Sequence, residues 1–249
     1  MIIIKNDKEI DLMRIAGRIV AETLLLVEKE VRPGITTAEL DRIAEEFITK
    51  HGAIPSFKGL YGFPASLCIS VNEQVVHGIP GGYVLKEGDI ISVDCGANIN
   101  GFHGDAARTF AVGNISEEAK RLIKVTEESF FKGLEFAKVG NKLTDISHEI
   151  QRYVEVSGFS VVREFVGHGI GKSVHEDPEV PNFGRPGRGP KLVAGMALAI
   201  EPMVNMGTYR VATLGDDWTV VSADKSLSAH YENTVVILPD GPEILTLIK

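Results

Sequence analysis

The amino-acid sequence predicts a single α/β domain over residues 1–249, in which two similar halves combine helices with antiparallel strands. Four stretches have apolar residues at helical spacing, and short apolar runs bounded by Gly and Pro are typical of strands. A helix followed by a strand also occurs twice in the same arrangement. With 249 residues and 44% hydrophobic content, the chain can bury one large core.

The predicted helices have defined starts and stops. They cover Asp7–Val31, Thr36 to a stop at Gly52, about Ser116 to Ala137, and Leu143–Ser157. Asn6 or Asp7 is the expected cap of the first helix, and Pro33-Gly34 ends it. Thr36 followed by Glu39 predicts a capping box at the start of the second.

The two halves share a spacing of glycines and strands. The matched segments are Gly34–Gly52 with Gly140–Gly158, and Leu85-x-x-Gly88 with Leu192-x-x-Gly195. Each Leu-x-x-Gly leads into an apolar strand that ends on a carboxylate, Asp94 in one half and Glu201 in the other. Unless these short patterns match by chance, the halves, roughly 34–113 and 140–238, form a pseudo-symmetric pair with a site on their shared seam.

Composition excludes several classes of partner. A net charge of -8 and a pI near 5.4 argue against DNA or an anionic membrane as a non-specific partner. Two cysteines are too few for a disulfide scaffold and favour a reducing, cytoplasmic location. The apolar start Met1–Ile4 is too short for a signal peptide, and no apolar run approaches the roughly 20 residues that span a bilayer.

Carboxylates inside apolar strands are the main indication of chemistry. Asp94 lies in the run 90–97 and Glu201 in the run 196–204, where a lone buried carboxylate costs several kcal/mol. The candidate metal ligands in or beside such runs are Asp94, Asp105, His168, Glu201 and Glu232. Two divalent cations would neutralise the four carboxylates, so the sequence predicts a two-metal hydrolase.

A hairpin is expected to bring the first two ligands together. The segment 98–102 is typical of a β-turn, and its strands would place Asp94 near Asp105. An Asp near a turn is often only a turn former, but Asp105 lies beyond the turn. Oxygen-rich ligation with a single His suits Mn, Fe(II), Co or Zn.

Three histidines are candidates for the reaction. His168 lies between glycines in 166–171, which leaves room for its ring to reach a metal, while His77 and His175 could stabilise a tetrahedral intermediate. For any single His, a structural role is the alternative. The glycine run could also be a phosphate-binding turn, but it lacks the Gly-x-Gly-x-x-Gly pattern.

Taken in order, five motifs resemble the type I methionine aminopeptidases over essentially the whole chain. They are Val75–Pro80 (VVHGIP), Gly101–Asp105 (GFHGD), Gly167–Gly171 (GHGIG), Ile200–Val204 (IEPMV) and Tyr231–Thr234 (YENT). The resemblance implies a pita-bread fold and removal of initiator Met. It also implies two divalent metal ions held by the five candidate ligands, with Glu201 as the proton shuttle.

The same resemblance assigns roles to other residues. His175 would bond the substrate carbonyl oxygen, His77 the scissile nitrogen or the intermediate, and one metal with Asp94 the free α-amine. The expected walls of the methionine pocket are Phe63, Cys68, His77 and Trp218, with Tyr61 and Leu60 nearby. Leu60 and Val174 depart from the usual family pattern, which has aromatic residues there.

The expected substrates are nascent polypeptides that begin with Met and have a small second residue, and a monomer is expected. The basic loop 184–191 is either a solvated surface or a transient contact with the ribosome.

Three alternatives remain. A proline-specific pita-bread peptidase usually has a further N-terminal domain. A type II methionine aminopeptidase has a long insertion between His175 and Glu201, and a metal-free binding module would have lost ligands.

Overall fold

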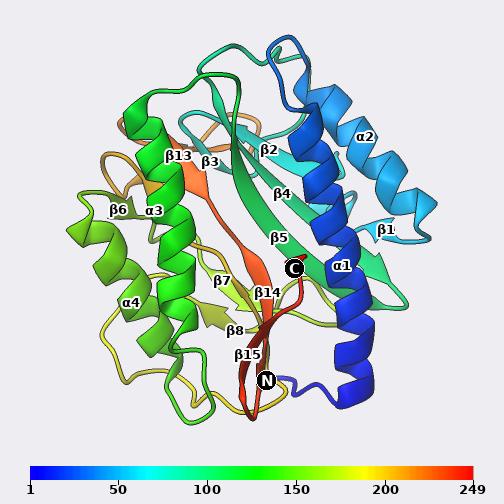
Figure 1. The fold of residues 1–249 in the computed structure, drawn as a ribbon, viewed down its shortest axis with the longest axis vertical. Helices are drawn as coiled ribbons and strands as arrows, with labels where there is room; N and C mark the ends of the chain where they lie inside the picture. Colours follow the sequence, from blue (N-terminus) through cyan, green and yellow to red (C-terminus); the bar gives the residue numbers. More distant parts are fainter. Residues whose placement is uncertain (249) are drawn as a thin grey trace.

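The computed structural model describes residues 1–248 and confirms an α/β class with two helix pairs (Figure 1). The helices are α1 Asp7–Glu30, α2 Thr37–Lys50, α3 Glu117–Leu134 and α4 Leu143–Val156, with a short 3-10 helix at Leu60–Gly62. Figure 1 shows α1 and α2 on one side and α3 and α4 on the other, all in front of the strands. None of the helices within residues 1–248 combines the length and apolar character needed to cross a bilayer.

Local hydrogen bonds explain where the helices begin and end. Asn6 and Glu9 form a reciprocal capping box on α1. The predicted box on α2 is only half formed: Thr36 Oγ1 accepts from Glu39 N, but the Glu39 carboxylate bonds Arg42 instead. Helix α3 ends at Leu134, before the predicted end near Ala137. After Leu134 the backbone hydrogen bonds join residues three apart, as in a 3-10 turn, instead of four apart.

The strands form four small sheets. The first contains β1 Ile54–Pro55, β2 Leu67–Val71, β4 Ile90–Ile99 and β5 Phe102–Ala111. The second contains β6 Ser160–Val161, β10 Met203–Asn205 and β13 Ser228–His230, and the third β3 Gln74–Val76, β11 Val211–Thr213 and β12 Val220–Ser222. The fourth contains β7 Gly167–Gly169, β8 Glu176–Val180, β9 Ala197–Ile200, β14 Asn233–Leu238 and β15 Gly241–Ile244. All pairings are antiparallel, as expected.

The predicted hairpin is present and longer than expected. β4 and β5 pair continuously from Ile90↔Ala111 to Ile99↔Phe102. Asn100 (φ 55°) and Gly101 (φ 80°) both take the left-handed conformation that a two-residue hairpin turn requires. The carboxylates Asp94 and Asp105 therefore lie in the middle of a long, buried ladder rather than at a strand end.

The starts of α2 and α4 make the same contacts. Thr36 bridges Val84, and Lys142 bridges Lys191. Gly34 N donates to Leu85 O at 2.8 Å, and Gly140 N donates to Leu192 O at 3.0 Å. Both helices have 14 residues. These matched contacts support the proposal that segments 34–113 and 140–238 are related halves.

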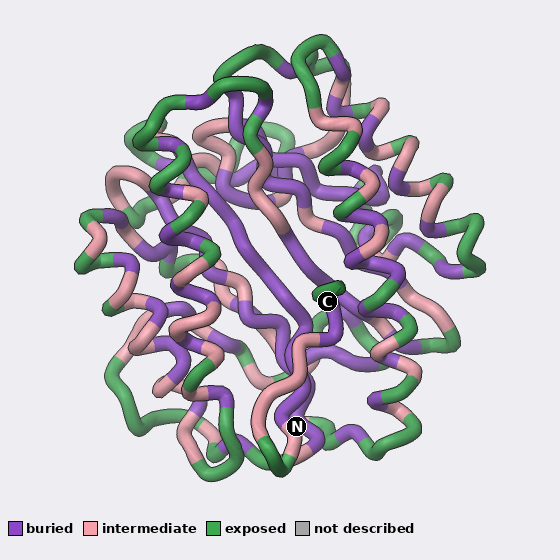
Figure 2. Tube along the Cα trace, in the orientation of Figure 1, coloured by how far each residue is buried: buried purple, intermediate pink, exposed green. Residues whose placement is uncertain are grey.

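The core lies between the helices and the sheets, where Figure 2 shows the long central strands mostly buried. Side chains of α1 and α2, such as Leu24 and Leu40, pack on β2 and β4 through residues such as Ile69 and Val93. Other clusters join α3 and α4 to β9, β10 and β14. The helices therefore cover one side of the sheets, and a site can form on the opposite side.

Candidate active site

One cavity of about 690 Å³ brings together all of the residues that the sequence analysis named. Its lining includes the five candidate ligands and the other predicted site residues, Phe63, Cys68, His77, His175 and Trp218. Leu60 and Tyr61 also line it. Residues from both halves therefore meet at one place, as the seam hypothesis requires.

Strand register positions the carboxylates. On the β4–β5 ladder Asp94 pairs with Ala107 and Gly96 pairs with Asp105, so the two carboxylates are diagonal neighbours on one face. Glu201 directly follows β9 and Glu232 directly precedes β14, and the pairing of Asn233 with Ile200 makes these two residues adjacent. Backbone bonds between Glu232 and Ala107 join the two sheets. The four carboxylates thus come from two antiparallel strand pairs, β4–β5 and β9–β14, and lie where these pairs meet.

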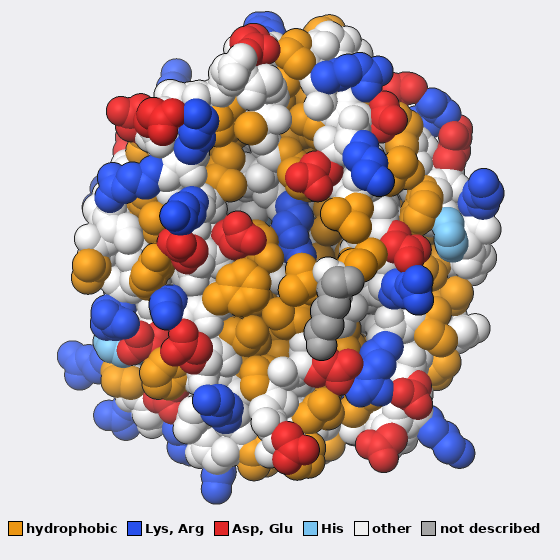
Figure 3. Space-filling view, viewed as in Figure 1, with side chains coloured by type: hydrophobic (Ala, Val, Ile, Leu, Met, Phe, Trp, Pro, Cys, Tyr) orange, Lys and Arg blue, Asp and Glu red, His pale blue; other side chains and the backbone are white. Residues whose placement is uncertain are grey.

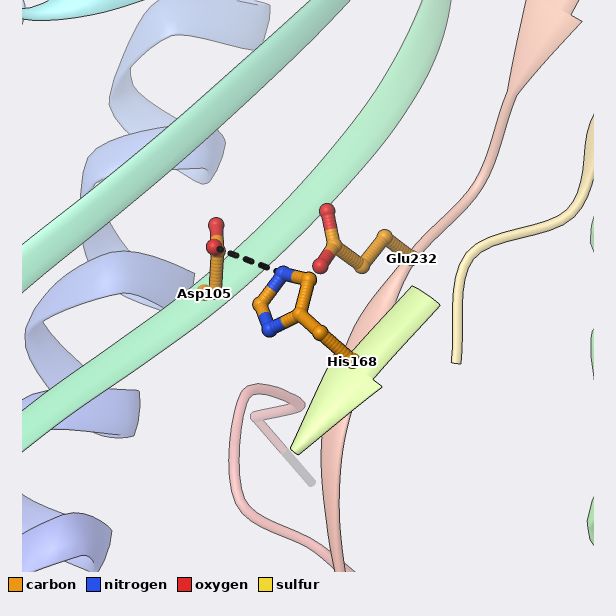
Figure 4. Close-up of side chains that lie close together, drawn as sticks. All are labelled: Asp105, His168 and Glu232. Carbon is orange, nitrogen blue, oxygen red and sulfur yellow. Dashed lines mark ion pairs between the residues drawn. The ribbon is translucent and has the colours of Figure 1, made fainter. Parts of the chain in front are cut away.

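His168 lies in the middle of β7 and points toward this group (Figure 4). Its Nε2 is 3.9 Å from Asp105 Oδ2 and 3.6 Å from Glu201 Oε1. One donor atom each of Asp105, His168 and Glu232 lies within 4.8 Å of the others. Figure 4 shows these three side chains converging from β5, from β7 and from the segment just before β14. Such spacing suits donors that share a metal ion, since each would lie about 2 Å from it.

The glycines beside His168 are needed for close strand packing. A Cβ on Gly167 would lie 2.3 Å from Ala199 O, and one on Gly169 would lie 2.0 Å from Asp177 O. Neither position has room for a side chain. The Gly-His-Gly sequence therefore lets β7 fit between β8 and β9 and present its imidazole to the cavity.

Burial makes the charges at this site unfavourable without a cation. It raises the pKa of Asp94 to about 7, and burial together with the neighbouring carboxylates raises the pKa values of Asp105 and Glu232 well above the usual range. The pKa of Glu201 is raised for the same reasons. Burial lowers the pKa of His168 to about 4, which keeps its ring neutral and able to bind a metal near neutral pH.

Unpaired polar atoms give an independent test of the metal hypothesis. Asp94 Oδ1, Asp105 Oδ1 and Glu232 Oε1 are buried and have no hydrogen-bond partner. Buried polar atoms without partners are rare in folded proteins and require an explanation such as an ion. Because three of them converge with a neutral imidazole, the residues present fit a divalent-metal centre.

The cavity wall beside this centre is aromatic and apolar. Phe63 and Trp218 pack edge to face with ring centroids 5.1 Å apart, and Cys68 is buried beside them with its thiol pKa raised by burial. Val174 is buried in the same apolar cluster. Leu60 is partly buried against it.

The two catalytic histidine candidates line the cavity. His175 stacks on Tyr61 with centroids 5.8 Å apart and meets the His168 ring edge to face at 4.5 Å. His77 has φ 60°, an unusual conformation for a non-glycine residue, and its ring packs against Phe165. Burial lowers the pKa of His77 to about 4.

Sequence reasoning missed two residues beside the centre, the buried His230 and the partly buried Arg108. His230 lies on β13, and its Nε2 faces Glu201 and Glu232. A signal for it was available, because residues two apart in an extended chain point to the same side, as His230 and Glu232 do. Arg108 lies behind the centre, where it donates to Glu232 O and Asn233 Oδ1 and covers the Tyr231 ring.

Comparison with known proteins agrees with the geometry. Residues 11–239 match the model of metallopeptidase family M24. Over full length of both chains, this chain is 78% identical to the methionine aminopeptidase of Clostridium perfringens and 58% identical to methionine aminopeptidase 1 of Bacillus subtilis.

Solved structures show the same relationship. The methionine aminopeptidase of Thermotoga maritima superposes with a TM-score of 0.98 at 47% identity, with all of both chains covered. The prolidase of Pyrococcus furiosus has a TM-score of 0.82 at 23% identity, and the match covers 99% of this chain but 66% of the prolidase, which indicates a shared fold alone. The architecture is the pita-bread fold, and the chain belongs to metallopeptidase family M24 and, within it, to the methionine aminopeptidases.

Proposed function

We propose that this protein is a metal-dependent aminopeptidase that removes the initiator methionine from nascent polypeptides with a small second residue. The observation that carries the proposal is the convergence of five donors from both halves on one cavity, with three carboxylate oxygens left without partners. The identity to full-length methionine aminopeptidases supports it.

Asp94, Asp105, His168, Glu201 and Glu232 would hold two divalent ions. Bound there, such ions lower the pKa of a coordinated water and polarise a carbonyl oxygen. The donor set of four carboxylates and one imidazole suits Mn, Fe(II), Co or Zn.

Glu201 is placed to move the proton. Its carboxyl group is almost buried, and burial raises its pKa, so it can hold a proton near neutral pH. It accepts a proton from the attacking water and later gives it to the leaving amine.

The histidines and Asp94 orient the substrate. His175, at the open edge of the cavity, donates to the carbonyl oxygen as negative charge develops. His77 lies on the far wall and bonds the scissile nitrogen. Asp94, together with an ion, receives the free α-amine, which restricts the reaction to the first residue of a chain.

The apolar wall selects methionine. Phe63, Cys68, His77 and Trp218 form a slot that accepts an unbranched thioether side chain. The second residue must fit the confined opening beside His175 and Tyr61, so small side chains are favoured there.

We also infer that the protein works as a cytoplasmic monomer near the ribosome. Arg185 and Arg188 are exposed on the basic loop 184–191, which is tied to the start of α4 by bonds from Gly187 N to Asp145 and from Arg188 N to Thr144. Sedimentation with ribosomes should be weakened by Arg185→Glu with Arg188→Glu, and equal sedimentation would exclude this loop as the contact.

The proposed function is tested on three peptides. Metal-stripped protein is supplied separately with Co, Mn, Fe(II) and Zn and given Met-Ala-Ser, Leu-Ala-Ser or N-acetyl-Met-Ala-Ser. We expect metal-dependent release of Met from the first peptide only. No release with any ion would contradict the proposal, and release from the blocked peptide would exclude the α-amine site.

A further inference from the structure

The buried imidazole of His230 lies next to the proposed proton shuttle. His230 is the last residue of β13, where it pairs with Met203 of β10. Thr109 Oγ1 accepts from His230 N and donates to His230 O, both at 2.9 Å, so the backbone is held from both sides. The side chain is 2% exposed. The ring position is therefore set by the fold rather than by a mobile loop.

The Glu201 carboxylate lies between two imidazoles. His168 Nε2 is 3.6 Å from Glu201 Oε1, and His230 Nε2 is 3.6 Å from Glu201 Oε2. The two oxygens of one carboxylate thus face different rings.

His230 Nε2 needs a partner. It is buried without a hydrogen bond, and an unpaired buried polar group destabilises a fold. The carboxylate oxygens near it are Glu201 Oε2 and, at 3.9 Å, Glu232 Oε2. A charge-assisted N–H···O bond has a length of about 2.7–2.9 Å, so a small rotation of the Glu201 carboxylate would complete the nearer one.

His230 is not among the residues that line the substrate cavity, whereas all five proposed ligands are. It lines a separate cavity of about 280 Å³ on the helix side of the sheets, together with residues such as Arg108 and Tyr231. Figure 3 shows this side, where apolar side chains gather between α1 and α3. One donor atom each of Glu201, His230 and Glu232 also lies within 4.8 Å of the others, a spacing that a metal ion could share. The place of His230 outside the substrate cavity favours a role through Glu201, and the two cases are separated by experiment.

We propose that His230 is a positioning residue whose Nε2–H donates to Glu201 Oε2 and so orients the carboxylate that moves the proton. The proposal rests on the proposed function, because it assumes that role for Glu201. It adds one side chain to the five proposed ligands and the two histidines that act on the substrate.

The first test uses two substitutions with matched shapes. His230→Leu removes the donor and keeps most of the volume, whereas His230→Gln places an amide N–H near the position of Nε2. In Met-Ala-Ser hydrolysis we expect His230→Leu to lower kcat about 10- to 100-fold with KM changed less than about twofold, and His230→Gln to recover most of kcat. His51→Gln, at the exposed end of α2, is the control and should match the wild type.

The second test does not depend on turnover. Pulsed EPR of the Mn(II)-loaded protein counts coordinated imidazole nitrogens, and we expect the signal of one imidazole in the wild type, unchanged in His230→Leu. Thermal unfolding of each variant shows whether the fold is intact.

Each outcome decides the proposal. Low kcat in His230→Leu, recovery in His230→Gln and one imidazole in both proteins would support it. Two imidazoles in the wild type and one in His230→Leu would make His230 a ligand and overturn it. Wild-type kcat in His230→Leu, or equal loss in both substitutions, would also overturn it. An inactive wild type would refute the proposed function, while the EPR experiment would still report on His230.

Discussion

A buried ion pair joins Lys5, near the start of the chain, to Glu176, the residue that follows His175. Lys5 Nζ lies 2.5 Å from Glu176 Oε2, and the two side chains are 2% and 6% exposed. Glu176 Oε1 also accepts from the backbone of Lys172 and Ser173. The substitution Lys5→Met removes the ammonium group, keeps most of the side-chain volume, and leaves the carboxylate of Glu176 buried.

The expected loss of stability follows from these contacts. Breaking a buried pair from one side costs roughly 3–5 kcal/mol, because a charge is left without its partner. Two backbone N–H groups still bond Glu176, so we expect the low end, about 3 kcal/mol. For a protein of this size that corresponds to a fall in Tm of roughly 6–12 °C. Adding Glu176→Gln to Lys5→Met removes the stranded charge and should restore most of the loss.

Urea unfolding and thermal unfolding measure these free energies. Lys124→Met is the control, because its pair with Glu128 is exposed and long, at 3.8 Å, and should contribute at most about 1 kcal/mol. A loss below about 1 kcal/mol in Lys5→Met, or no recovery in the double variant, would refute the reasoning. Because Glu176 adjoins His175, we also expect a lower kcat for Met-Ala-Ser hydrolysis in Lys5→Met.

Three further predictions concern the centre itself. Gly169→Ala should lose about 1–3 kcal/mol and bind less metal, because its Cβ would collide with Asp177 O, whereas Gly215→Ala, with open space around it, should change stability by less than about 0.5 kcal/mol in the same urea titration. Since burial raises the pKa of Asp94 to about 7, the metal-free protein holds protons between about pH 4 and 7 that ions must displace. The apparent affinity for divalent ions should therefore weaken as the pH falls from 8 to 5. Calorimetry of ion binding in buffers of different ionisation enthalpy should detect protons released at pH 7. If no protons are released, the pKa of Asp94 is not raised. His175→Ala should lower kcat about 100-fold or more with metal content unchanged, as steady-state kinetics and metal analysis would show, and an unchanged kcat would remove its proposed role.

The sequence predicts much of the fold because its local signals are strong. Asn100-Gly101 between alternating strands indicates a hairpin, and once that hairpin forms, Asp94 and Asp105 must become neighbours. The length and spacing of the glycine-framed helices likewise indicate two halves before any contact is known. These features depend on residues close in the chain, where backbone conformation and side-chain period are sufficient.

Other features depend on residues far apart and could not be predicted. Lys5 and Glu176 are separated by 171 positions, and no local pattern indicates that they meet in a buried pair. The end of α3 before Ala137 depends on tight turn bonds that propensity does not show. His230 is a different case, because its place two residues before Glu232 was a signal, but β13 is only three residues long and its alternation is easily overlooked.

The proposed role of His230 also concerns how the Glu201 carboxylate could both hold a divalent ion and move a proton. Such a carboxylate must keep its orientation while its charge changes. The β7 imidazole of His168 faces one oxygen of Glu201, and the β13 imidazole of His230 faces the other at the same distance of 3.6 Å. His168 lies on β7, which pairs with β9, and His230 lies on β13, which pairs with β10 in a different sheet. In the proposed arrangement, strand register in two sheets orients Glu201 from two sides, which a loop-built site would not do.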